Sequence, residues 1–169
     1  MPTPLRTLAC LTPLLLAATA CTPAPHAPRS DAKPFTAAPF EQALGKDWRL
    51  TYRDMPGTDR RMGTGAGRKS LRIGVVETKS TTDTLTSLAC QAFGKDVAEA
   101  TRFLLACAEA ATGAPAPVRT WLTTHIDRPS TGPGHATQHG PLDYHLGVNR
   151  TQAVRVLYIN PAAQSGGKQ

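Results

Sequence analysis

The chain has 169 residues, 40% hydrophobic and 18% charged, and its 19 Lys and Arg residues against 12 Asp and Glu residues give a net charge of +7. A helix that spans a membrane needs roughly 20 apolar residues, and no stretch is both that long and that apolar, so a membrane-spanning protein is not expected. The positive excess favours anionic partners such as acidic proteins, wall polymers or lipid headgroups.

Residues 1–20 have the pattern of an export signal. Arg6 is the only charged residue in this segment, and an apolar run follows it from Leu8 to Ala20. The run is about 13 residues long, which is too short to cross a bilayer. An ordinary secretory signal is one interpretation, since Ala18 and Ala20 also suit a common cleavage site.

A second interpretation rests on the end of this run, where Ala18, Thr19 and Ala20 lead directly into Cys21. These residues resemble the lipobox of bacterial lipoproteins, with Ala18 where the family most often has Leu. The resemblance covers the first 21 residues only. It implies diacylglycerol on the Cys21 thiol, cleavage just before Cys21, and acylation of the new amino group by a fatty acid such as palmitate.

The resemblance also implies a location. Two or three acyl chains hold a protein stably on a bilayer, so the chain is expected on the cell membrane or the outer membrane, facing the periplasm or the cell exterior. In a cell with two membranes, the uncharged Thr22 after the cysteine implies the outer one. Nucleic acid is not expected as a partner, because an exported protein rarely meets it.

The rest of the chain divides by composition. Residues 21–39 form a lipidated tether, because they are rich in proline, which favours an extended chain (Pro23, Pro25, Pro28, Pro34 and Pro39). Residues 40–161 have the size of one globular domain. Residues 162–169 are predicted to be a disordered tail.

Two strands are predicted early in the domain, from alternating apolar residues in Trp48–Tyr52 and in Leu71–Val76. The segment between them, Pro56–Gly67, is rich in Gly and charge and is predicted to be a hairpin loop. Residues 82–111 then carry apolar residues at spacings of three and four, which predicts an amphipathic helix. Gly94, followed by a capping box at Asp96, also allows two shorter helices.

Three further strands are predicted, in Val118–Ile126, Asp143–Val148 and Ala153–Ile159, with a hairpin turn between the last two. The order of elements predicts an α+β fold: a small, mostly antiparallel sheet of about five strands, with one long helix or two short helices packed on one face.

Cys90 and Cys107 remain as a pair after export, and an even number of cysteines in an oxidising compartment favours a disulfide. On one continuous helix, however, 17 residues would separate them by roughly 25 Å, beyond the reach of a disulfide. A bridge therefore requires a break near Gly94, and two buried free cysteines are the alternative.

His135, His139 and His145 are the candidate metal ligands, for zinc or copper. The first two lie in a loop predicted for Pro129–Pro141, with Asp143 and His125 nearby. Exposed loop histidines without a metal are the alternative.

A basic patch is also predicted, as a binding surface for anionic partners or as an ordinary solvated loop; its residues are Arg60, Arg61, Arg68, Lys69 and Arg72. The sequence G-T-G-A-G-R-K-S at residues 63–70 lacks the spacing and the flanking elements of a phosphate-binding loop.

No catalytic residue is identified, because nucleophile-elbow and triad patterns are missing from the sequence. The sequence therefore favours a non-enzymatic binding or accessory domain of the cell envelope, without a cofactor. A metal-handling lipoprotein and an enzyme whose site assembles only in the fold are the alternatives.

Overall fold

The computed structural model describes residues 35–67, 71–79, 83–132 and 134–162. The predicted signal, Cys21, the tether up to residue 34, Arg68, Lys69 and tail residues 163–169 lie outside the described residues. In chain order the elements are α1 (Ala37–Trp48), β1 (Thr51–Asp54), β2 (Arg60–Ala66), β3 (Arg72–Lys79), β4 (Leu85–Phe93), α2 (Val97–Thr112), α3 (Ala116–His125), β5 (His135–His139), β6 (Leu142–Asn149) and β7 (Val154–Pro161).

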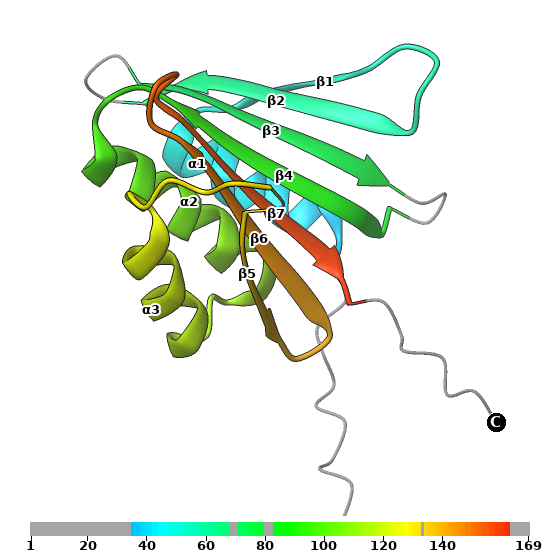
Figure 1. Cartoon of the computed structure of the whole chain (residues 1–169). Coiled ribbons are helices and arrows are strands. Elements are labelled where there is room, and N and C mark those ends of the chain that lie inside the picture. The colour runs from blue at the N-terminus through cyan, green and yellow to red at the C-terminus, as the bar shows by residue number, and fades with distance from the viewer. Residues whose placement is uncertain (1–34, 68–70, 80–82, 133, 163–169) are drawn as a thin grey trace, which may run out of the picture. The chain divides into compact units, whose positions relative to one another are not determined.

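The described strands form one antiparallel sheet in the order β1-β2-β3-β4-β7-β6-β5. The helices lie on one side of this sheet (Figure 1). The predicted α+β class and the antiparallel sheet with helices on one face are confirmed, with seven strands rather than about five.

The core lies between the helices and the sheet, because every second residue along each strand faces the helices. In β3, Ile73, Val75 and Glu77 are buried, while the residues between them are partly exposed. The largest fully buried side chains come from both layers: Phe40 and Leu44 of α1, Phe103 and Leu104 of α2, Leu122 of α3, and Leu88, Tyr144, Leu146, Leu157 and Ile159 of the strands.

The helix predicted over residues 82–111 is wrong in its first part, which forms β4. Leu88, Cys90 and Ala92 alternate inward there and pair with β3 and β7, so sheet pairing overrides a periodicity that also fits a helix. The break at Gly94 (φ 151°) and the cap are confirmed, since the Asp96 side chain accepts a hydrogen bond of 2.9 Å from Glu99 N–H.

The strand predicted over Val118–Ile126 is also wrong, because this segment forms α3. Val118, Leu122 and Ile126 are spaced by four residues, which places them on one side of a helix, and all three are buried. Pro117 lies in the first turn, where a helix needs no N–H.

Two predicted loops contain strands. β2 occupies most of Pro56–Gly67, so the connection after β1 shortens to a few residues around Gly57. β5 occupies the middle of Pro129–Pro141 and pairs with β6. In both cases the partner strand supplies backbone hydrogen bonds that local composition does not reveal.

The helix α1 is an element that the sequence reading missed. It begins at Ala37, inside the segment 21–39 assigned to the tether, and ends at Trp48, where a strand was predicted. Pro39 fits because it lies in the first helical turn. Phe40 and Leu44 fix the helix to the core.

Candidate functional site

The sheet surface opposite the helices, here called the open face, carries a row of apolar side chains. Strand register aligns Met62, Val76, Ala89 and Tyr158 across β2, β3, β4 and β7. These four residues are called the apolar row. Tyr158 is the most exposed large hydrophobic residue described, at 43%.

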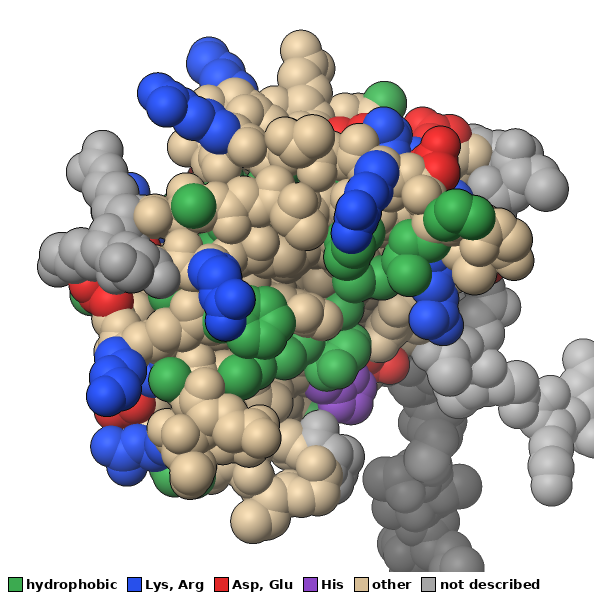
Figure 2. Space-filling view, turned by 90° about the horizontal axis from the view of Figure 1, so that it is seen from above, with side chains coloured by type: hydrophobic (Ala, Val, Ile, Leu, Met, Phe, Trp, Pro, Cys, Tyr) green, Lys and Arg blue, Asp and Glu red, His purple; other side chains and the backbone are tan. Residues whose placement is uncertain are grey.

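Three more apolar residues extend this surface along β4 and β7. Phe93 pairs with Val154, and Val156 lies between Val154 and Tyr158 on the same face. Figure 2 shows a face on which hydrophobic side chains form a continuous band, with Lys and Arg side chains beside it and a histidine at one border. Contiguous exposed apolar surface of this kind marks interaction sites.

Arginines border the band. Arg53 pairs with Met62 at the β1 edge, Arg72 pairs with Phe93, and Arg60 precedes Met62 by two residues on the same side of β2. Among the charged residues of the described strands, Asp143 is the one acid whose register places it on this face. The open face is therefore apolar along its middle and positively charged on its β1–β3 side.

The residues of the predicted basic patch do not come together on one surface. Arg60 pairs with Thr78 and Arg72 pairs with Ala66, so these arginines lie at opposite ends of β2 and β3, about 20 Å apart by strand geometry. Arg61 faces the helices instead. Only Arg60 and Arg72, of the described members, belong to the open face.

The predicted metal ligands are divided between the two faces of the sheet. His135 and His139 lie on the helix side of β5, whereas His145 pairs with Tyr158 and lies on the open face. His135 contacts His125 of α3, with ring centroids 4.6 Å apart. In the described part of the chain, no group of three or more His, Cys, Asp or Glu side chains is placed to hold a metal ion.

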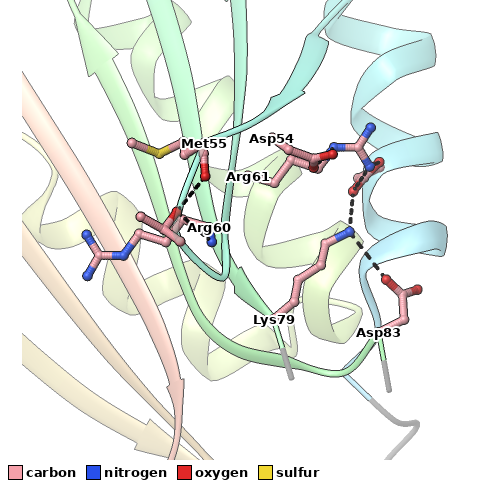
Figure 3. Close-up of polar contacts among 8 residues, drawn as sticks. Asp54, Met55, Arg60, Arg61, Lys79 and Asp83 are labelled. Carbon is pink, nitrogen blue, oxygen red and sulfur yellow. Dashed lines mark hydrogen bonds and ion pairs between the residues drawn. The ribbon is translucent and has the colours of Figure 1, made fainter. Parts of the chain in front are cut away.

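A cluster of ion pairs joins α1 to the β2–β3 end of the sheet. Glu41 of α1 accepts hydrogen bonds from Arg61 Nη1 (2.6 Å) and Lys79 Nζ (3.0 Å). Lys79 also lies 3.3 Å from Asp83, and Arg61 lies 3.4 Å from Asp54 (Figure 3). These contacts hold the first helix onto the sheet.

Glu77 lies beside this cluster and is completely buried. Burial, and then the charge of Glu41, raise the pKa of Glu77 from about 4.5 to about 8, although the charges of Lys79 and Arg61 act in the opposite direction. Both carboxyl oxygens of Glu77 are buried without a hydrogen-bond partner among the described residues, so its charged form lacks compensation for lost hydration. The environment of Glu77 therefore favours its neutral, protonated form.

Tyr52 extends from β1 over this part of the core. A side chain at Gly63 would come within 2.6 Å of the Tyr52 ring, so the glycine makes room for the ring to lie across β2. The Tyr52 hydroxyl is buried without a hydrogen-bond partner among the described residues. Burial, and then the charge of Glu77, raise the pKa of Tyr52, which keeps this hydroxyl neutral.

Cys90 and Cys107 are both buried as free thiols. Cys90 lies in the middle of β4 and Cys107 in α2, which packs over that strand. Burial, and then a hydrogen bond with Cys90, raise the pKa of the Cys107 thiol. The two sulfur atoms are thus neighbours across the helix–sheet interface.

Two adjoining hollows lie on the helix side, with volumes of about 360 and 440 Å³. Both are lined by Asp47, Trp48 and Arg102. The Arg102 guanidinium group already pairs with Glu99 (2.8 Å) and lies over the Trp48 ring (5.7 Å). The Arg102 side chain at these hollows is thus already held by Glu99 and Trp48.

The sequence reading did not identify Glu77, Glu41, Tyr52 or the apolar row. A signal for Glu77 was present, because the buried positions Ile73 and Val75 continue in strand phase to residue 77. A carboxyl group on the apolar side of a strand indicates a neutral or paired acid. The apolar row has no local signal, because it depends on the order and register of four strands.

None of the described helices is long and apolar enough to cross a membrane. Comparison of the chain with known protein families, with curated proteins and with solved structures finds no match.

Proposed function

We propose that this chain is a lipid-anchored protein of the cell envelope whose open face binds an acidic protein partner. The observation that carries the binding role is the apolar row bordered by Arg53, Arg60 and Arg72 on the side of the sheet that no described helix covers. The proposed role is non-enzymatic, with these residues providing a surface for contact.

The chemistry of the open face supports a protein as the partner. Tyr, Met and Arg are enriched in the cores of protein interfaces, and Tyr158, Met62 and Arg72 supply all three. Buried apolar contacts would provide affinity, while the arginines would select acidic surfaces. A lipid anchor on Cys21 would already hold the domain at a membrane, so this face is available for another ligand.

A photo-crosslinking amino acid in place of Tyr158, in the full chain in growing cells, tests the binding role. We expect a crosslink to one or a few acidic envelope proteins. The matched control is the same amino acid in place of Thr123, which is exposed on α3 and faces away from the sheet. The double variant Arg53→Glu, Arg72→Glu should remove the Tyr158 crosslink, because it reverses charge on the open face.

Crosslinks of equal strength from positions 158 and 123 would contradict the proposal. So would crosslinks from position 158 to phospholipid alone, since they would make the membrane surface the ligand. Circular dichroism of the double variant shows whether the fold is retained, as expected for substitutions at exposed positions.

The anchor is tested separately. Intact mass of the membrane-bound chain should show an acylated Cys21 at the amino terminus, and Cys21→Ser should release the protein from the membrane fraction. A mature terminus elsewhere, or a Cys21→Ser variant that stays membrane-bound, would refute the lipoprotein assignment.

A further inference from the structure

The chain turns at Gly94 from the strand β4 into the helix α2, and Cys90 and Cys107 lie at similar distances on either side of this turn. Cys90 precedes Gly94 by four residues, about 13 Å along a strand. Cys107 follows Asp96 by eleven residues, about 16 Å along a helix. Because α2 packs back over β4, these nearly equal distances place one cysteine opposite the other.

The two side chains face each other inside the core. Both cysteines are 0% exposed, and the Cys107 thiol lies near enough to Cys90 for that residue to raise its pKa. In strand register Cys90 lies between Val75 and Leu157, both buried on the helix side. The pair is therefore enclosed by apolar side chains and lies away from both the open face and the hollows.

We propose that Cys90 and Cys107 form an internal disulfide that links β4 to α2 in the exported protein. The proposal rests on the export that the proposed function assumes, because thiol oxidation proceeds outside the cytoplasm. In the step, the two thiols lose their protons and join in one S–S bond. Their two electrons reduce the disulfide of an envelope thiol oxidoreductase to a dithiol.

The burial of both thiols sets the order of events. Exchange needs a thiolate that can reach the oxidant, and in the folded chain the thiols are enclosed and Cys107 is held in its neutral form. Oxidation therefore precedes closure of α2 over β4. Once formed, the bond is shielded from reductants in the native protein.

The first experiment uses the full chain with its own amino-terminal segment, isolated from the envelope, then unfolded and alkylated without a reductant. We expect Cys90 and Cys107 to remain unlabelled, and each to take one label after reduction. Native protein treated with reductant before unfolding should remain unlabelled too. Labelling of both cysteines without reduction, in chain whose processing shows that it was exported, would overturn the proposal.

The second experiment separates this proposal from that of the lipoprotein. The full chain with Cys10→Ser and Cys21→Ser is unfolded, reduced, and refolded in a glutathione redox buffer, so that neither export nor lipid is involved. An internal disulfide should form in most molecules, and Cys107→Ala in the same background should give none. Two thiols that stay free after refolding would overturn the disulfide whatever the fate of Cys21.

Discussion

The neutral carboxyl group of Glu77 gives this protein a stability that should depend on pH. Glu77→Gln replaces the protonated acid by a neutral amide of nearly the same shape. The substitution removes the titration of the buried group but leaves its packing unchanged. The difference between the two proteins therefore isolates the cost of ionising Glu77.

The size of the effect follows from the shift of the pKa from about 4.5 to about 8. Each pKa unit corresponds to about 1.36 kcal/mol, so full ionisation of Glu77 in the folded chain costs at most about 5 kcal/mol. This is on the order of half the free energy of unfolding of a typical domain. Between these two values the folded chain holds a proton that the unfolded chain has released. The free energy of unfolding of the wild type should therefore fall as pH rises from about 5 to about 8.

The assay is urea unfolding of both proteins at pH values from 5 to 9, followed by tryptophan fluorescence. The two proteins should be similarly stable at pH 5, and Glu77→Gln should become the more stable one by several kcal/mol at pH 9. Glu109→Gln is the matched control, because that carboxylate is 58% exposed in a surface ion pair with Arg119. A constant difference between wild type and Glu77→Gln across this range would refute the reasoning.

Substitutions at three further residues test other parts of the structure. Gly63→Ala should cost about 1 to 3 kcal/mol in urea unfolding, because the new methyl group would lie 2.6 Å from the Tyr52 ring; unchanged stability would contradict that packing. Asp96→Ala should lower the free energy of unfolding by about 1 kcal/mol, because Glu99 N–H loses its acceptor. Asp96→Asn should lower it much less, because the amide oxygen can still accept that hydrogen bond. Tyr158→Asp should leave the midpoint of thermal unfolding nearly unchanged while abolishing capture of the open-face partner; a large drop in the midpoint would mean that Tyr158 supports the fold.

Residues with one strong local pattern were assigned correctly from the sequence. Apolar alternation in Leu71–Val76 predicted β3, and the strands predicted in Asp143–Val148 and Ala153–Ile159 are β6 and β7, which pair as the expected antiparallel hairpin. Asp96 and Glu99 marked the start of α2, because a cap depends on a few adjacent residues. The α+β class followed from these elements.

Segments with two compatible patterns were decided by their neighbours. Residues 85–93 fit a helical spacing and a strand alternation, and pairing with β3 and β7 selects the strand. Val118, Leu122 and Ile126 are also compatible with both, and their packing against the core selects the helix α3. In both segments the tertiary contacts outweigh the local propensity, because the observed secondary structure is the one that buries the apolar side chains against the rest of the core.

The candidate sites depend most on tertiary structure. The sequence alone determined which residue types were available: a cysteine that resembles a lipidation site, a pair of later cysteines, and an excess of arginine. Strand order and register decided that Met62 and Tyr158 share one row, that Cys90 faces Cys107, and that His135 and His145 are separated. These residues become neighbours when segments that are distant in sequence pack into one core. The free energy of that packing cannot be read from the local sequence pattern of either segment.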